Sequence, residues 1–272
     1  AHVAAGKPLG GTSAGLAVMG SVAYAALHDG DLTSELALRQ PGHHWITLET
    51  DFLEIPVMAG ILTDSHFTER NRLGRLLVML TRGMLEGTGP LVGLGIDERT
   101  ALCIDSDGTA RLLGEGRASL VTVGDPEPAM LERAFGPQVA EVVVLGPAST
   151  FNLATRAIGN PVDRMTVFAT EDGLRARVQE GQGTAAAGGG PGSLVIVGGA
   201  LRASNDAVFG ELIRRGRLDT GGVLGVIPAA SGKPVRSAMA FMDALQARGV
   251  ARERMRLIPL ALEDDSGTPE VD

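Results

Sequence analysis

The sequence predicts an α/β protein, because short apolar strands alternate with helical segments along most of the chain. Hydrophobic residues make up 44% of the 272 residues, enough for a packed core, while aromatic residues contribute only 3%. The core is therefore expected to consist of Val, Leu, Ile and Ala. Residues 194–260 show the alternation most clearly, as strand, helix, strand, helix and strand, an order typical of a parallel sheet with helices on its faces.

In the first hundred residues, apolar periodicity predicts two helices and two strands. Residues 16–27 are apolar and Ala-rich, which favours a helix, and residues 45–48 alternate as in a strand. A stripe of Leu and Met residues predicts a long helix over 68–87. The continuous apolar run at 91–96 indicates a buried strand.

The middle of the chain is expected to be rich in strands. Residues 101–105 and 110–113 flank an Asp-Gly turn and predict a hairpin. Further strands are expected at residues 120–123, 142–145 and 165–168. Residues 180–192 are rich in Gly and Ala, which indicates a flexible seam. Beyond the seam we expect strands at 194–197, 222–227 and 255–260 and helices at 207–215 and 237–248.

Composition excludes several classes of protein. The formal net charge of −8 argues against a nucleic-acid partner, since such domains usually carry a basic face. No apolar run approaches about 20 residues, so we expect no membrane span. A single cysteine, Cys103, excludes an internal disulfide and a cysteine zinc cage. We expect no metal and no cofactor. The start of the chain lacks a signal-peptide core, so a cytoplasmic location is favoured, while a secreted one stays open.

A Gly-x-Ser-x-Gly pattern at Gly11-Thr12-Ser13-Ala14-Gly15 has the spacing of a nucleophile elbow, in which glycines permit a sharp turn from strand to helix. Such a turn exposes the hydroxyl of Ser13, and the backbone N–H of Ala14 would face a developing oxyanion. The alternative is a glycine-rich turn whose serine only caps a helix.

A serine nucleophile needs a base, and His66 is the best placed of the five histidines. It follows an apolar segment and precedes the predicted long helix, where catalytic residues of α/β proteins tend to lie. The alternative is a histidine that packs passively in a helix-capping loop. The remaining four are expected to be ordinary surface or loop residues: His2, His28, His43 and His44.

Three motifs, in this order, resemble one known family: Gly11-Thr12-Ser13-Ala14-Gly15; Asp64-Ser65-His66-Phe67 followed by Arg70, Arg72, Arg75 and Leu76; and Gly95-Ile96-Asp97-Glu98 followed by Thr100, Ala101 and Leu102. They are similar to the cyanophycinase family of serine peptidases, with aspartyl dipeptidases as more distant relatives. The resemblance implies a three-layer αβα sandwich with a mostly parallel sheet, related to class I glutamine amidotransferases. It also implies Ser13 as nucleophile, His66 as base and Glu98 as the residue that orients the base. A lone glutamate would otherwise be read as a surface carboxylate at a strand end.

In this family, arginines at the positions of Arg70, Arg72 and Arg75 contribute to binding a poly-aspartate chain that bears arginine on each side-chain carboxylate. The alternative is a solvated basic face paired with glutamates. On a helix Arg72 and Arg75 would lie about 60° apart, with Arg70 away from them and closer to His66. We therefore expect Arg70 to face the pocket. Asp64 would hold the substrate guanidinium or cap the helix.

The chain departs from the family pattern in two ways. Ser65 stands where the family usually has glutamine, a substrate-contacting position, so the reaction type is better supported than the substrate. Residues 193–272 resemble the amino-terminal part of the family yet follow the catalytic motifs, and a turn that supplies oxyanion donors lacks a counterpart. The sequence is consistent with a single α/β peptidase domain over 1–272 whose segments are circularly permuted, or with two ordered fragments.

These observations predict a serine peptidase that releases β-aspartyl-arginine dipeptides from cyanophycin, with a peptide as its partner and a homodimer as its assembly. An aspartyl or isoaspartyl dipeptidase is the nearest alternative. A binding protein that keeps the fold and the anion site but has lost turnover is an alternative from another class.

Overall fold

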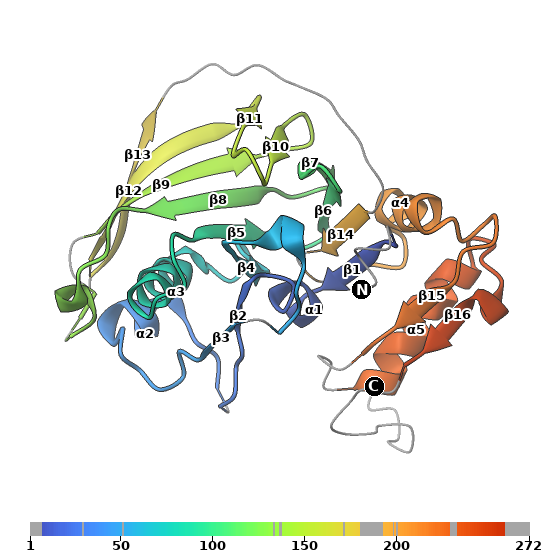
Figure 1. The fold of residues 1–272 in the computed structure, drawn as a ribbon, viewed down its shortest axis with the longest axis horizontal. Helices are drawn as coiled ribbons and strands as arrows, with labels where there is room; N and C mark the ends of the chain where they lie inside the picture. Colours follow the sequence, from blue (N-terminus) through green and yellow to red (C-terminus); the bar gives the residue numbers. More distant parts are fainter. Residues whose placement is uncertain are drawn as a thin grey trace. The chain divides into compact units, whose positions relative to one another are not determined.

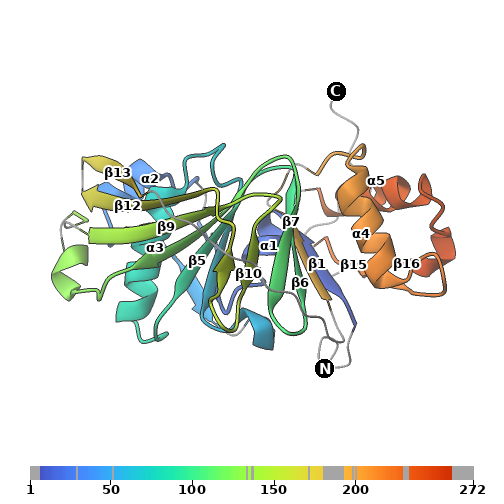
Figure 2. The same cartoon turned by 90° about the horizontal axis from the view of Figure 1, so that it is seen from above.

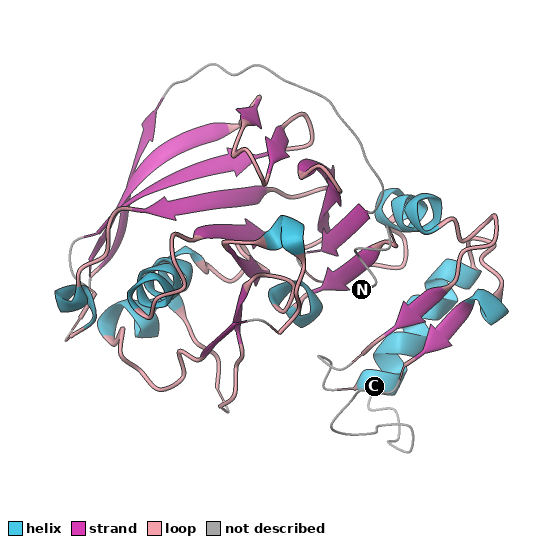
Figure 3. Cartoon of the chain, in the orientation of Figure 1, coloured by secondary structure: helices cyan, strands magenta, loops and turns pink. Residues whose placement is uncertain are grey.

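A computed structural model describes residues 7–28, 30–50, 52–132, 134–135, 138–170, 172–179, 193–197, 199, 201–228 and 233–258. The chain divides into two compact units, Ala1–Leu201 and Arg202–Asp272, and each is described by itself. The predicted seam at 180–192 lies outside the described residues. Figure 1 shows the elements in sequence colours, and Figure 3 separates helices from strands.

The larger sheet of the first unit has eight strands in the order β13-β12-β9-β8-β5-β4-β2-β3. Parallel pairing is confined to β2, β4 and β5, and the other neighbours are antiparallel. The strands are β2 (Val22–Tyr24), β3 (Leu48–Thr50), β4 (Ile61–Ser65), β5 (Val92–Ile96), β8 (Ala118–Val123), β9 (Gln138–Leu145), β12 (Asp163–Thr170) and β13 (Gly173–Gln179).

A second sheet of six strands has the order β1-β14-β6-β7-β10-β11, and Figure 2 shows β1, β6, β7 and β10 following one another across it. Strand β14 lies between β1, to which it is parallel, and β6, to which it is antiparallel. The strands are β1 (Leu9–Thr12), β6 (Thr100–Asp105), β7 (Thr109–Gly114), β10 (Thr150–Asn152), β11 (Ile158–Gly159) and β14 (Ser193–Val197).

Two apolar cores hold these layers together. One face of the eight-stranded sheet packs against helices α2 (Ser34–Arg39) and α3 (Leu73–Leu85) through residues such as Leu62, Leu76 and Val121. The other face packs against the six-stranded sheet and the short helix α1 (Ala14–Ala17). The described part of the first unit also includes the short 3₁₀ helices η1 (Pro56–Met58) and η2 (Pro128–Leu131).

The second unit contains a short parallel pair of strands, β15 (Leu224–Val226) and β16 (Met255–Leu257). Its helices are α4 (Asp206–Gly216) and α5 (Pro234–Gln246), and one 3₁₀ turn, η3 (Arg252–Arg254), precedes β16. The side chain of Asn205 caps α4 by accepting a hydrogen bond from the N–H of Val208. The rings of Phe209 and Phe241 pack against each other at 5.5 Å between centroids.

Several sequence predictions are confirmed. The hairpin with the Asp-Gly turn is β6 and β7, the buried strand at 91–96 is β5, and the strands predicted in the middle of the chain are β8, β9 and β12. Strand β14 and the elements of the second unit also match their predicted ranges to within a few residues.

The helix predicted over 16–27 is wrong, because α1 ends at Ala17 and β2 begins at Val22. Val22 pairs with Leu62 of β4. A Cβ on Gly20 would meet the carbonyl oxygen of Ile61 at 2.8 Å, so the chain here lies directly against β4. Strand pairing therefore outweighs the helical propensity of an Ala-rich segment.

The predicted start of the long helix at residue 68 is also wrong, because α3 begins at Leu73. Residues 66–72 instead form turns in which His66 and Asn71 adopt positive φ angles of 47° and 48°. The strand expected at 45–48 lies later, at β3.

The expectation of a mostly parallel sheet is wrong for the described strands, since most neighbours are antiparallel. The parallel sheet expected from residues 194–260 is divided as well. Both edges of β14 are occupied by β1 and β6, so β15 and β16 pair only with each other among the described strands. The resemblance also implied helices on both faces of the main sheet, whereas one face is covered by the six-stranded sheet.

Candidate active site

Ser13 occupies a sharp turn between β1 and α1. Its backbone has φ 54° and ψ −118°, an uncommon conformation for a residue with a side chain. The glycine two positions earlier makes this turn possible, because a Cβ on Gly11 would lie 2.2 Å from the carbonyl oxygen of Gly15. The chain therefore folds at Ser13 as a nucleophile elbow does, with α1 beginning at the next residue.

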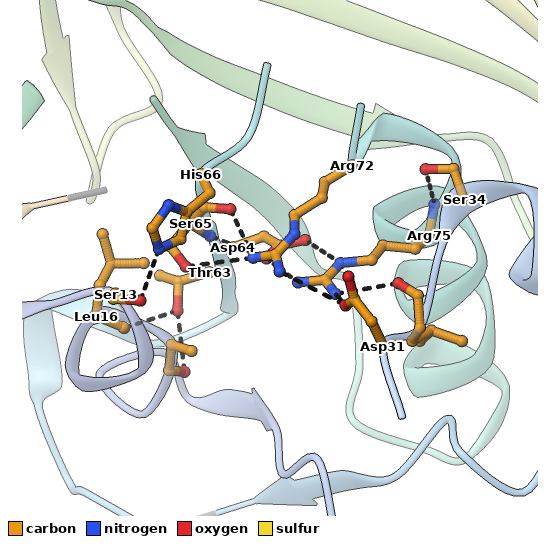
Figure 4. Close-up of polar contacts among 12 residues, drawn as sticks. Ser13, Leu16, Asp31, Ser34, Thr63, Asp64, Ser65, His66, Arg72 and Arg75 are labelled. Atoms are coloured by element: carbon orange, nitrogen blue, oxygen red, sulfur yellow. Dashed lines mark hydrogen bonds and ion pairs between the residues drawn. The ribbon is translucent and has the colours of Figure 1, made fainter. Parts of the chain in front are cut away.

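His66 lies directly after β4 and joins the serine to a carboxylate. Its Nε2 is 2.7 Å from the Oγ of Ser13, and its Nδ1 is 2.8 Å from Oε1 of Glu98. Figure 4 shows the imidazole of His66 directed toward Ser13. Because a carboxylate accepts the Nδ1 hydrogen, Nε2 is left to accept the serine hydroxyl proton. Three residues far apart in sequence thus form one hydrogen-bonded line.

Glu98 follows β5 in the turn that leads to β6. Its hydrogen bond to His66, together with the charges of His66, Arg70 and Arg99, lowers the pKa of the Glu98 carboxyl, against an opposing effect of desolvation. The backbone N–H of Glu98 also donates to Oε1 of Glu69 at 3.1 Å. Glu98 is therefore ionised at neutral pH, the state in which a carboxylate is able to stabilise an imidazolium.

A buried ion cluster lies beside Ser13 and His66 (Figure 4). The carboxylate of Asp64 accepts hydrogen bonds from both Nε (2.8 Å) and Nη2 (2.5 Å) of Arg75. Arg72 donates through Nη1 to the carbonyl oxygen of Ser65 at 2.8 Å and lies 3.4 Å from the Ser65 hydroxyl. All four residues are buried.

Arg72 and Arg75 also face the exposed carboxylate of Asp31, each at 3.8 Å. Burial lowers the pKa of the Arg72 guanidinium, and the neighbouring Asp64 opposes that effect. The guanidinium of Arg75 lies over the ring of Tyr24, 5.2 Å from its centroid. The cluster therefore ties α3 to β4 and to the loop before α2.

Arg70 differs from the other two arginines. It precedes α3 and is exposed, and its positive charge contributes to the lowered pKa of Glu98. Its guanidinium forms no ion pair with any residue in the described part of the chain. Unlike Arg72 and Arg75, Arg70 is therefore not part of the buried ion cluster.

Sequence reasoning missed three residues that brace the site. Asp97 accepts hydrogen bonds from the backbone of two separate loops. Val197 accepts a hydrogen bond from the backbone N–H of Ser13 at 3.1 Å, and Gly199 lies against the imidazole of His66. Asp97 stands within a motif quoted above, beside the more conspicuous Glu98. Val197 and Gly199 carried no chemical signal in the sequence, because they act through the backbone.

The described residues include neither a metal-binding cluster nor a membrane-spanning helix. No group of three or more His, Cys, Asp or Glu side chains in that part of the chain is arranged to hold a metal ion. None of the helices that the structure describes has the length and apolar character to cross a membrane.

Fold and site together define an α/β protein with a hydrogen-bonded Ser–His–Glu triad. No protein family model matches the chain. The chain is similar in sequence to curated proteins, and the three described next are all named cyanophycinase. That of Synechococcus elongatus is 33% identical over 145 residues, 53% of this chain and 38% of the relative. Those of Trichormus variabilis and Geminocystis herdmanii are 34% and 30% identical, over 43% and 42% of this chain and 33% and 36% of the relatives. These similarities support a cyanophycinase-like family for this chain, which spans well under half the length of the relatives it matches.

Proposed function

We propose that this protein is a serine peptidase that hydrolyses cyanophycin, multi-L-arginyl-poly-L-aspartate, to β-aspartyl-arginine dipeptides. The observation that carries the proposal is the hydrogen-bonded line Ser13–His66–Glu98 in a chain similar to cyanophycinases. A serine, a base and an orienting carboxylate are the parts that acyl transfer to a hydroxyl requires.

In the proposed reaction the Oγ of Ser13 attacks the carbonyl carbon of the scissile amide while its proton passes to Nε2 of His66. His66 then gives this proton to the leaving amine, and the C–N bond breaks to leave an acyl-enzyme. Water attacks the ester, again losing a proton to His66, and the Ser13 oxygen takes that proton back as it departs. Glu98 stabilises the imidazolium at both stages.

The oxyanion would form beside the backbone N–H of Ala14, the first residue after the nucleophile and the first of α1. We propose that Arg70 binds an aspartate carboxylate of the substrate. The buried carboxylate of Asp64 accepts hydrogen bonds from both Arg72 and Arg75. We therefore propose that these three residues hold the His66 loop in place rather than contact substrate. Ser65 is also buried and lies against Arg72, so we propose that it supports the His66 loop as well.

Incubation with purified cyanophycin, followed by mass spectrometry of the soluble products, tests the proposal. β-Aspartyl-arginine should appear with the native protein and be absent with Ser13→Ala, while Ser106→Ala, in the exposed turn between β6 and β7, should leave the yield unchanged. Cleavage of aspartyl or isoaspartyl dipeptides alone would assign a dipeptidase instead. Failure of a fluorophosphonate to label Ser13, with no product, would assign a binding protein. The homodimer stays a prediction that analytical ultracentrifugation checks.

A further inference from the structure

The residues that follow the predicted seam reach all three loops of the triad. The carbonyl oxygen of Val197, at the end of β14, accepts the backbone N–H of Ser13 at 3.1 Å. The carbonyl oxygen of Gly199 accepts the backbone N–H of Arg99 at 3.0 Å, directly after Glu98. The third contact is made with His66, and it depends on the absence of a side chain at Gly199.

Gly199 lies so close to the imidazole that no other residue fits without displacing it. A Cβ at this position would stand 2.3 Å from Cε1 and 2.4 Å from Nε2 of His66, far inside van der Waals contact. Nε2 is the ring atom that faces the Oγ of Ser13, and Cε1 is bonded to it. Because a Cβ is only one bond from its Cα, the Cα of Gly199 packs closely against this part of the ring.

The packing of Gly199 restricts the orientation of the His66 ring in a way that the hydrogen bond to Glu98 does not. A bond at Nδ1 fixes one edge of the ring but lets the opposite edge swing, and Nε2 lies on that opposite edge. Contact with the Gly199 backbone limits this swing at the position where Nε2 is 2.7 Å from the Ser13 hydroxyl. Geometric errors near 1 Å at a reacting group cost about 10²-fold in rate.

We propose that Gly199 is a positioning residue for the general base, a role that rests on the proposed function of Ser13 and His66. Its lack of a side chain is required by the imidazole and not only by its own backbone angle. Gly199 has φ +117°, a conformation that is strained for any L residue with a side chain. The experiment must therefore separate the cost of this angle from the cost of the clash.

Gly173 provides the matched control. It has a similar φ of +127°, but a Cβ there would meet no atom within 4 Å. Gly173→Ala therefore carries the backbone strain alone, whereas Gly199→Ala carries the strain and the collision with His66.

The first measurement is the rate at which a fluorophosphonate labels Ser13, with kcat and KM for cyanophycin as the second. In Gly199→Ala we expect the labelling rate and kcat to fall about 10²-fold, with KM changed less than about twofold, and in Gly173→Ala we expect near-native values. A folded Gly199→Ala protein that labels at the native rate would overturn the proposal. Labelling that depends on Gly199, in a protein that leaves cyanophycin intact, would uphold the positioning role and reject the substrate.

A double-mutant cycle on urea unfolding keeps the test independent of activity. If the clash is with the imidazole, Gly199→Ala should lower the unfolding midpoint more in the native background than in His66→Ala, where the ring is gone. A Gly199→Ala protein that folds only when His66→Ala is also present would support the same conclusion, that the clash is with the imidazole. An equal cost in both backgrounds, or failure to fold in both, would show that the backbone angle alone demands glycine and would overturn the proposal.

Discussion

The Oδ1 atom of Asp97 accepts a hydrogen bond from the backbone N–H of Thr68 at 3.0 Å, two residues after His66. Its Oδ2 accepts a hydrogen bond at 2.9 Å from the backbone N–H of Arg117, the residue before β8. Asp97 is 6% exposed and directly precedes Glu98. A single buried carboxylate therefore holds the loop of the base against the turn of the residue that orients it.

Asp97→Asn should weaken this connection, because an amide offers one acceptor oxygen where two backbone N–H groups need partners. We expect a loss of about 1–3 kcal/mol in the free energy of unfolding, the cost of one unsatisfied buried group. We also expect kcat to fall while KM stays near its native value, as measured with cyanophycin. Asp107→Asn is the control, since Asp107 also accepts two hydrogen bonds but within the exposed β6–β7 turn. Equal kinetics in the two variants would contradict a role for Asp97 at the site.

Arg75→Ala should destabilise the first unit strongly. The change leaves the carboxylate of Asp64 buried without its principal partner, which typically costs about 3–5 kcal/mol. Arg39→Ala is the control, because Arg39 pairs with Glu35 on the surface of α2, where such pairs contribute about 0.3–0.5 kcal/mol. Urea unfolding followed by circular dichroism measures both. A cost for Arg75→Ala no larger than for Arg39→Ala would show that the cluster does not support the fold.

Arg70→Ala should act on substrate binding and leave stability unchanged within about 0.5 kcal/mol, since an exposed arginine that forms no ion pair with a described residue contributes little to folding. We expect KM for cyanophycin to rise several-fold. Raising the salt concentration should weaken binding in the native protein more than in the variant, because the lost contact is electrostatic. A native KM in Arg70→Ala would assign Arg70 to the solvated surface.

Glu211 gives the second unit a pH dependence of known sign. Hydrogen bonds from Arg214 and Arg215, with their charges, lower the pKa of Glu211 to about 2 from an ordinary value of 4.5, against desolvation. A lowered folded-state pKa stabilises the fold fully above the ordinary value, and this contribution is lost as the pH falls from about 4.5 through about 2. Glu211→Gln should therefore lower the urea midpoint at pH 7, and the difference from native should shrink below pH 4.5.

The control for that measurement is Glu35→Gln, which removes an exposed ion pair with Arg39. The urea midpoint of this variant should differ little from the native midpoint at either pH. A native-minus-variant difference for Glu211→Gln that stayed constant from pH 7 to pH 3 would contradict the role assigned to its ionised form.

Local signals in the sequence predicted the elements that depend on local chemistry. The Asp-Gly turn and its flanking apolar runs are enough to define the β6–β7 hairpin. The Gly-x-Ser-x-Gly spacing points to Ser13 and the position before the long helix to His66, whereas Glu98 is assigned only through the family resemblance; the fold brings all three within hydrogen-bonding distance.

The periodicity of apolar residues could not predict which strands, far apart in sequence, pair with each other. The segment after Ala17 has helical propensity but forms a strand, because β4 offers it a parallel partner 40 residues away. Strand β14 likewise pairs with β1 and β6 instead of the strands that follow it in sequence. The importance of Gly199 could not be predicted for a related reason: its lack of a side chain leaves space for the imidazole of His66, a residue far away in sequence.

The position of β14 has a consequence for how the molecule can be assembled. Because β14 is hydrogen-bonded on both sides and its last residue, Val197, accepts the backbone N–H of Ser13, we expect the site to form even when the chain is cut between residues 179 and 193. Two polypeptides, residues 1–179 and 193–272, should therefore complement each other when expressed together, and each alone should lack activity. Fluorophosphonate labelling of Ser13 in the mixture but not in the larger fragment would make this chain a split enzyme whose nucleophile is switched on by strand addition.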